Sequence, residues 1–247
     1  MNYRSRAIIL KTIDYRDADK LVTLFSEKHG KVRAVARGVK KPASSLRVCL
    51  QPFCHSNLYL SGGKELENVT QGKLIDFFPN IREDIDLTLQ VLYLMELLDK
   101  SLMDHMALPS LYSVTLTVLE YLNTHGNNPL AIRYFEANLL KYLGYQPLLE
   151  RCVNCGTQSG KLQSFNLVRG GVICPECSKT LTSDFDFSGE ALSILRLISS
   201  RDVNTMHRIK ASQAALKNLE FFLEKNLEYH LERRFNMKKT IRTLKYL

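Results

Sequence analysis

Four cysteines in two close pairs are the residues whose type and spacing most clearly indicate chemistry. Cys152 and Cys155 form the first pair, and Cys174 and Cys177 form the second. Two residues between the members of a pair let both sulfurs face one point, and two such pairs supply the four thiolates of a tetrahedral Zn²⁺ site. The spacing predicts one structural zinc ion. An iron–sulfur cluster and two redox-active pairs are the alternatives, although no strand–helix–strand pattern of the thioredoxin kind lies nearby.

The residues between the two pairs predict how the pairs are brought together. The stretch Ser164–Ile173 has the pattern of two short strands around a turn at Gly170-Gly171. A hairpin here carries the second pair back to the first. A site closed by four cysteines has no open position for a substrate water, so the predicted metal is structural. For the two other cysteines, Cys49 and Cys54, we expect packing in an apolar core.

Two different patterns of apolar residues surround these cysteines. Short β-branched runs at residues 6–14, 21–25, 31–36 and 48–60 predict a small β-barrel or sandwich. After Pro79 the apolar spacing predicts helices over about residues 84–103, 110–122, 130–143, 188–199 and 211–231. We therefore predict an α+β fold class. The predicted domains are a β domain at 1–80, an all-helical domain at 81–147 and 181–247, and an inserted zinc ribbon-like module at 148–180.

Basic residues are concentrated at both ends of the chain. The formal net charge is +9; residues 1–80 carry 14 Lys/Arg and 7 Asp/Glu, and residues 233–247 carry 6 Lys/Arg and no acid. We expect a polyanion to bind at these ends. The first residues do not have the pattern of an export signal, and no apolar run approaches the ~20 residues that span a bilayer. Together with thiols spaced for metal, this predicts a cytoplasmic protein.

The first basic cluster lies on the third predicted strand and in the loop after it. Basic and apolar residues alternate on the strand, which predicts one basic face and one buried face. Several cations on one face can bind phosphates, so we interpret the cluster as a polyanion-binding surface. The alternative is a solvated strand face with a charged loop tip. The cluster consists of Lys31, Arg33, Arg37, Lys40, Lys41 and Arg47, with no acid from 31 to 47.

The second basic cluster is the C-terminal tail. Its candidate phosphate-binding residues are Lys238, Lys239 and Arg242. A helical tail would place Arg234, Lys238, Arg242 and Lys245 in one stripe. A disordered tail would be a basic arm, and a plain solvated end is the third interpretation.

Arg133 stands among apolar residues of the helix predicted at 130–143. Two interpretations are open. One is a core arginine paired with a carboxylate. The other, which makes Arg133 our candidate partner-binding residue, is the positive rim of an apolar groove for an acidic peptide.

The sequence contains no catalytic constellation that we recognise. The six histidines are scattered, and no Walker A, G-x-G-x-x-G or G-x-S-x-G motif occurs. Asp-x-Asp occurs at 17–19, 84–86 and 184–186, and two-metal nucleases use such carboxylates. Because the last two precede predicted helices, we expect them to cap those helices. The chain is therefore predicted not to be an enzyme.

Three segments are together similar to a known family. They are Gly30–Gly38 (GKVRAVARG), Leu50–Phe53 (LQPF) and Arg133–Tyr145 (RYFEANLLKYLGY). With the order of β domain, helices and cysteine pairs, they resemble the bacterial RecO family of recombination mediators over nearly the whole chain. The resemblance implies an N-terminal OB-fold β-barrel followed by a helical domain with a zinc module.

The resemblance also implies a function. It implies binding to single- and double-stranded DNA, annealing of complementary strands, and work with RecR to load RecA onto SSB-coated DNA at the nucleoid. Contact between the helical domain and the acidic C-terminal tail of SSB is implied as well. OB-folds often stack bases on aromatic residues, but residues 31–47 contain none, so we expect electrostatic, salt-sensitive binding. The alternatives are a zinc-ribbon adapter that binds only protein and a nuclease that uses the Asp-x-Asp pairs.

Overall fold

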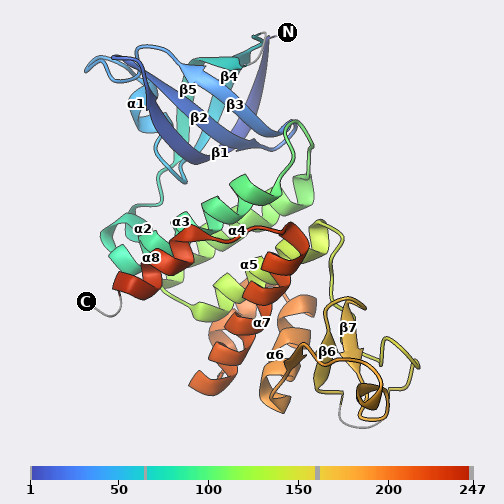
Figure 1. The fold of residues 1–247 in the computed structure, drawn as a ribbon. Coiled ribbons are helices and arrows are strands. Elements are labelled where there is room, and N and C mark those ends of the chain that lie inside the picture. The colour runs from blue at the N-terminus through green and yellow to red at the C-terminus, as the bar shows by residue number, and fades with distance from the viewer. Residues whose placement is uncertain (1, 64–65, 159–161, 245–247) are drawn as a thin grey trace. The chain divides into compact units, whose positions relative to one another are not determined.

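A computed structural model describes residues 2–63, 66–158 and 162–244 of the chain (Figure 1). The chain divides into two compact units, one of residues 1–126 with 235–247 and one of residues 127–234. The predicted domains, with boundaries at 80, 147 and 180, follow a different division and stay a prediction. None of the helices in the described ranges is long and apolar enough to cross a membrane.

The first unit begins with a closed sheet. Its strands are β1 (Asn2–Tyr15), β2 (Asp19–Ser26), β3 (Gly30–Ala36), β4 (His55–Ser61) and β5 (Glu67–Asp76). They pair in the order β1-β2-β3-β5-β4, and β4 pairs back with β1. Only β3 and β5 run parallel. Closure of five strands is the arrangement expected of an OB-fold, and the predicted N-terminal β domain is confirmed.

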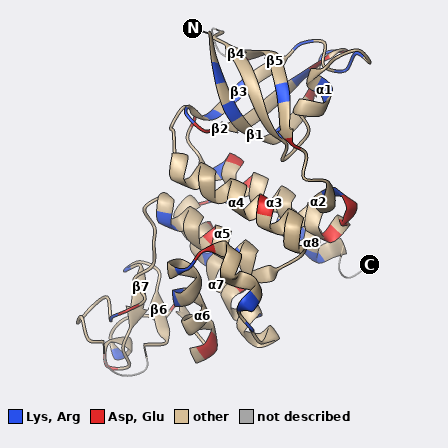
Figure 2. Ribbon diagram, turned by 180° about the vertical axis from the view of Figure 1, so that it is seen from behind, with Lys and Arg blue, Asp and Glu red and all other residues tan. Residues whose placement is uncertain are grey.

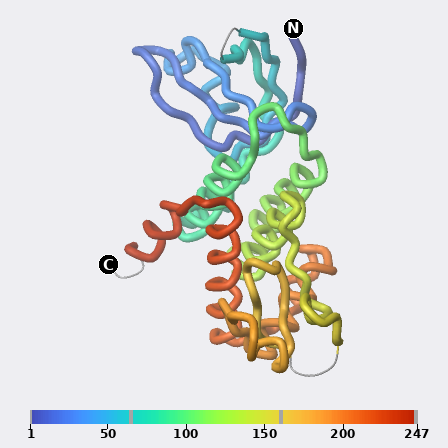
Figure 3. Tube along the Cα trace, turned by 45° about the vertical axis from the view of Figure 1, so that its right-hand side comes forward, coloured from blue at the N-terminus to red at the C-terminus, as the bar shows by residue number. Residues whose placement is uncertain are grey.

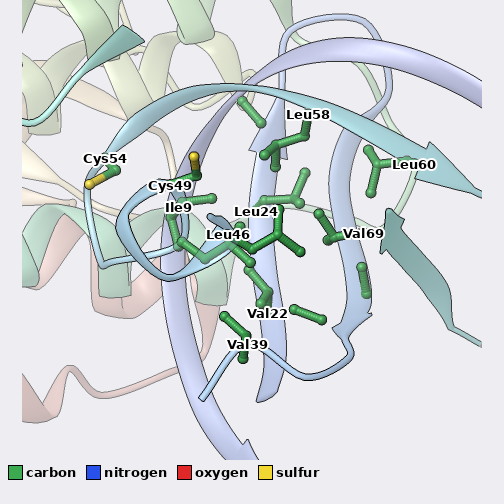
Figure 4. Packing of buried hydrophobic residues seen from close by; sticks show 14 of the residues in the cluster. Ile9, Val22, Leu24, Val39, Leu46, Cys49, Cys54, Leu58, Leu60 and Val69 are labelled. Atoms are coloured by element: carbon green, nitrogen blue, oxygen red, sulfur yellow. The ribbon is translucent and has the colours of Figure 1, made fainter. Parts of the chain in front are cut away.

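Apolar side chains from alternate strand positions fill the inside of this sheet (Figure 4). The short helix α1 (Leu46–Cys49) adds Leu46 and Cys49 to the same cluster. Cys49 and Cys54 are 4% and 0% exposed, as expected for packing residues. Other members seen in Figure 4 are Ile9, Val22, Leu24, Val39, Leu58, Leu60 and Val69.

The prediction of one strand over residues 48–60 is wrong at its beginning. This stretch contains the end of α1, and β4 starts only at His55. Between them Phe53 has a φ of 53°, a left-handed conformation that ends regular structure. Arg82 lies 3.9 Å from the centre of the Phe53 ring and donates a 2.8 Å hydrogen bond to the Pro52 carbonyl. A contact with a residue far along the chain thus shapes this segment.

Three helices follow the sheet within the first unit. They are α2 (Pro79–Glu83), α3 (Ile85–Ser101) and α4 (Pro109–His125). The Asp84 carboxylate accepts a 3.0 Å hydrogen bond from the Leu87 backbone N–H at the start of α3. The predicted capping role of Asp84 is confirmed.

The C-terminal tail forms a helix of the same unit. This helix, α8 (Asn236–Leu244), lies beside α3 (Figures 1 and 3). Its first backbone N–H groups, those of Asn236 and Met237, donate 2.9 and 2.8 Å hydrogen bonds to the Glu96 carboxylate. Of the three interpretations of the tail, the structure has the helix.

The second unit contains three packed helices. They are α5 (Pro129–Tyr142), α6 (Gly189–Ser200) and α7 (Gln213–Leu231), with a short 3-10 helix η2 (Val203–Arg208) before α7. Each packs against the other two. Ser188 caps α6 through the Ala191 backbone N–H, as the sequence predicts.

A small sheet precedes α6 in the second unit. Its strands are β6 (Ser164–Asn166), β7 (Gly171–Ile173) and β8 (Phe185–Asp186), in the order β7-β6-β8. The predicted hairpin of β6 and β7 is confirmed. The expectation that Asp184 and Asp186 cap a helix is wrong. Asp184 accepts a 2.8 Å hydrogen bond from the Leu167 N–H and Asp186 accepts a 2.7 Å bond from the Ser164 hydroxyl, so both brace the small sheet.

Candidate metal centre and nucleic-acid interface

The two cysteine pairs come together in the second unit. The sulfur atoms of Cys152, Cys155, Cys174 and Cys177 all lie within 4.8 Å of one another. The β6–β7 hairpin returns the chain, so that Cys174 follows β7 directly and Cys177 opens the 3-10 helix η1 (Cys177–Lys179). Only Cys155 is exposed. The four sulfurs could hold one metal ion, as the sequence predicts.

Hydrogen bonds favour the thiolate form of Cys152, whereas at Cys177 the Asn154 amide is outweighed by the neighbouring cysteine sulfurs and burial, which raise the pKa of Cys177 to about 12. Burial alone raises the pKa of the Cys152 thiol, but backbone N–H groups of Cys155, Cys174 and Asn154 outweigh it and lower the pKa to about 6. The Asn154 side-chain amide lies 3.3 Å from the Cys177 sulfur, where it can donate a further bond. Because the thiolate is the form that binds metal, the donor set fits a structural Zn²⁺ ion.

An aromatic cluster ties this site to the helices of its unit. The Phe165 ring of β6 lies 4.9 Å from the Phe222 ring of α7. Phe187, just before α6, lies 4.5 Å from Phe222. The loop carrying the first cysteine pair is bonded to β7, because the Val153 N–H donates to the Val172 carbonyl at 2.8 Å. A metal bound by the four sulfurs would therefore act on the hairpin and, through it, on α7.

Two cations of the first basic cluster are neutralised within the first unit. The ammonium of Lys31 donates a 2.8 Å hydrogen bond to the Asp99 carbonyl and lies 3.5 Å from the Asp104 carboxylate. Arg33 forms an ion pair with the same carboxylate, with its Nε 3.0 Å from Asp104 Oδ2. The loop between α3 and α4 is held there by the His105 N–H, which donates to the Lys31 carbonyl at 2.8 Å. Asp104 therefore already neutralises two of the cations on the predicted basic face of β3.

The other cations of the cluster lie beyond β3, up to and including α1. Arg37, Lys41 and Arg47 are exposed, and no carboxylate of the described ranges lies within salt-bridge distance of them. Lys40 is half-buried and lies 2.9 Å from the Asp14 carboxylate. Figure 2 shows Lys and Arg on the strands and loops of this sheet. The segment 37–47 is therefore the most accessible part of the cluster.

The cations of the tail do not share one environment. Lys239 and Arg242 are exposed on α8, whereas Lys238 is 4% exposed. The Lys238 ammonium lies 5.4 Å from the centre of the Tyr93 ring on α3, a favourable cation–π distance. The expected stripe therefore does not form: Lys238 is buried, and Lys245 lies outside the described residues.

Arg133 lies inside the second unit. It is 7% exposed. Its Nε lies 3.2 Å from the Glu136 carboxylate, one turn along α5, and one of its terminal nitrogens lies 3.9 Å from Glu220 on α7. This is the first of the two interpretations, a core arginine paired with carboxylates. Because the Arg133 side chain is buried, it does not form the positive rim of a surface groove.

The chain matches known proteins over nearly its full length. The sequence profile described as Recombination protein O N terminal matches residues 1–78, and the one described as Recombination protein O C terminal matches residues 82–239. A DNA repair protein RecO of Syntrophomonas wolfei is 54% identical over 245 residues, which cover 99% of this chain and 98% of that protein. The chain belongs to the RecO family. RecO proteins of Desulforamulus reducens and Bacillus pumilus are 34% and 32% identical, over 94% and 85% of the chain and 91% and 81% of those proteins.

Membership in the RecO family assigns the chain to DNA repair and recombination. The site of this RecO protein contains residues that sequence reasoning missed, namely the counter-ions Asp14 and Asp104. Arg33 and Asp104 are 71 positions apart, and no local pattern relates such residues. A signal for Asp14 existed, since it faces Lys20 across the β1–β2 hairpin.

Proposed function

We propose that this RecO-family chain is a DNA-binding recombination mediator without catalytic activity. It binds single- and double-stranded DNA, anneals complementary strands and helps RecR load RecA onto single strands coated with SSB. It acts in the cytoplasm, in association with the nucleoid. The proposal rests on the family and on the cations of the first unit.

One observation supports DNA binding most directly. Arg37, Lys41 and Arg47 are exposed within the segment 37–47, and their side chains have no carboxylate partner in the described ranges. Cations without internal counter-ions can replace the ions condensed around phosphates, which releases those ions and drives binding. Lys239 and Arg242 on α8 are exposed and provide a second basic site in the same unit.

Annealing follows from this chemistry without a catalytic residue. Two complementary strands repel each other through their phosphates. A protein that neutralises phosphates on each strand lowers this repulsion, and base pairing then supplies the free energy. Because such contacts carry no sequence information, binding of this kind is independent of sequence.

The second unit contributes structure and partner binding in this proposal. A zinc ion held by the two cysteine pairs fixes the β6–β7 hairpin against α7. Arg133, paired with Glu136 and Glu220, positions α5 against α7 rather than touching the SSB tail. RecR and the SSB tail are the protein partners that we propose.

Fluorescence anisotropy of labelled single-stranded DNA across a salt series tests the proposal. We expect binding that falls steeply with salt, no cleavage in Mg²⁺, and faster annealing of complementary oligonucleotides. The double variant Arg37→Ala/Lys41→Ala should reduce the salt slope by about 0.7 for each phosphate contact that is lost. The matched control is Lys28→Ala/Lys73→Ala, which removes two exposed cations elsewhere on the same sheet.

The opposite outcomes are also informative. An unchanged salt slope in the Arg37→Ala/Lys41→Ala variant would remove segment 37–47 from the interface. Absence of binding even at low salt would favour the adapter that binds only protein. Mg²⁺-dependent cleavage would favour the nuclease.

A further inference from the structure

A pocket of about 450 Å³ opens on the first unit, and two cations of the first basic cluster, Lys40 and Arg47, line it. It is lined by residues of β1, β2, the segment after β3, and α1 with the residues that follow it. Its size lies within the range of about 300–1,000 Å³ that is usual for small-molecule sites. The pocket can therefore hold a group larger than a phosphate.

Three cations and one carboxylate surround this pocket. The cations are Lys20, Lys40 and Arg47. Asp14 lies 2.9 Å from the Lys40 ammonium and 3.8 Å from the Lys20 ammonium. Its side chain is 68% exposed, so a ligand can displace it without opening the core. Because the oxygens of Asp14 form ion pairs with two of the cations, they mark where the oxygens of an anionic ligand would bind.

The rest of the lining is apolar or uncharged. Val39 and Leu50 are 2% and 3% exposed and form the depth of the pocket, with Pro52 beside them. Thr12 and Gln51 add a hydroxyl and an amide, which both donate and accept hydrogen bonds. Cations beside an apolar wall with a few uncharged polar groups are the lining that suits a nucleotide, whose phosphate is anionic and whose base has an apolar face and polar edges.

We propose that this pocket holds one nucleotide of a single DNA strand, with its phosphate among Lys20, Lys40 and Arg47 and its base against Leu50 and Pro52. The inference rests on the proposed DNA binding and makes it more specific. Arg37 and Lys41 are exposed on either side of Lys40 in the chain and can hold the neighbouring phosphates, which favours a nucleotide within a strand over a free one. A base in duplex DNA is stacked and paired, so entry is easier from a single strand.

The test compares two strands with the same number of phosphates. One is a fluorescein-labelled oligothymidine, and the other is an abasic strand of equal length. We expect the unmodified protein to bind the thymidine strand several-fold more tightly, because only that strand has bases whose apolar faces can be buried against Leu50 and Pro52. Thr12→Phe fills the pocket without changing charge and should abolish this preference. The matched control Thr70→Phe, at an exposed position of β5, should keep it.

A second pair of variants tests the anionic side of the pocket and does not depend on Thr12→Phe folding. Asp14→Asn removes the internal competitor and should tighten binding of the thymidine strand several-fold. Asp17→Asn changes the net charge equally at an exposed position outside the pocket and should have little effect.

Three results would overturn the nucleotide pocket and leave DNA binding intact. The first is equal affinity of the unmodified protein for thymidine and abasic strands. The second is a preference that persists in Thr12→Phe. The third is equal effects of Asp14→Asn and Asp17→Asn. Failure of DNA binding itself looks different, because neither strand would then bind at low salt.

Discussion

Single carboxylates set how much of the basic cluster is available to a ligand. Asp104 neutralises both Lys31 and Arg33. Partial burial works to raise the pKa of Asp104, but Arg33 and Lys31 outweigh it and hold the pKa below its usual range. The carboxylate is therefore charged at neutral pH, where it would compete with the phosphates of a bound strand. Its ion pairs are present above the ordinary pKa of about 3.9 and are lost only as the pH falls through the lower folded-state value.

Replacing this carboxylate should strengthen DNA binding. In Asp104→Asn the cations of Lys31 and Arg33 lose their counter-ion, so we expect tighter binding at low salt and a salt slope steeper by about 0.7 for each phosphate contact that is gained. Fluorescence anisotropy across a salt series measures both. Asp17→Asn is the matched control, and equal effects of the two changes would show that only net charge matters.

Gly30 is the residue on which the approach of the α3–α4 loop to β3 depends. It has a φ of +68°, and a Cβ there would lie 2.0 Å from the Met106 carbonyl oxygen. Gly30→Ala should lower the free energy of unfolding by more than the roughly 1–2 kcal/mol that the left-handed conformation costs alone. Gly126→Ala is the control, because Gly126 has a φ of +75° and no atom within 4 Å of an added Cβ. Denaturant unfolding that gives equal losses for both would argue against the close approach.

At the scale of elements, the cysteine pairs hold a hairpin that is too small to be stable alone. The strands β6 and β7 have three residues each, and short two-stranded hairpins are at best marginally stable in water. Their stability must therefore come from the third strand β8 and from the packing of Phe165 against Phe222, and a metal held by the four sulfurs would add to it.

Removal of the metal should therefore loosen one region only. Treatment with a chelator, or Cys174→Ser, should raise amide hydrogen exchange across β6 and β7, with a smaller effect on α7 and none on the closed sheet. Metal analysis should give one zinc per chain before treatment. Cys49→Ser is the control for loss of a cysteine outside the cluster. DNA binding that is lost together with the metal would place part of the interface in the second unit.

The helix α8 depends on one carboxylate of α3. Glu96 accepts hydrogen bonds from the first N–H groups of α8, and loss of such a cap costs about 0.5–2 kcal/mol. In Glu96→Ala we expect faster hydrogen exchange in α8 and easier proteolysis of the tail. Glu120→Ala, at an exposed position of α4, should leave the tail unchanged. Equal protection of α8 in both variants would mean that Phe235 and Lys238 hold it without the cap.

Elements with local signals were predictable from the sequence, and elements decided by distant contacts were not. The cysteine pairs, the turn at Gly170 and the caps at Asp84 and Ser188 each depend on neighbours within a few residues. The start of β4 depends on Arg82, which fixes Phe53 from outside the strand. The same holds for the basic residues. The sequence shows where the basic clusters lie along the chain, but it does not show that Arg133 is buried against α7 or Lys238 against α3.

On the scale of the whole molecule, charge is separated within the first unit. Residues 1–80 carry a surplus of bases, whereas residues 81–126 carry 7 Asp/Glu and 2 Lys/Arg. Ion pairs join the two parts, such as Lys11 with Asp99 at 2.6 Å. Exposed pairs of this kind are screened by salt and contribute little individually, so we expect them to set the availability of the basic surface rather than the stability of the fold.

These internal ion pairs have a consequence for the length of strand that the protein can recognise. Lys31, Arg33 and Lys40 already have carboxylate partners, so a ligand must displace several of them together. A short oligonucleotide brings too few phosphates to do so, whereas a long one engages all the cations in a single encounter. The chain would then bind short fragments of DNA weakly and bind long single-stranded gaps tightly. Affinity measured against strand length should show a threshold, and a merely proportional rise would contradict this view.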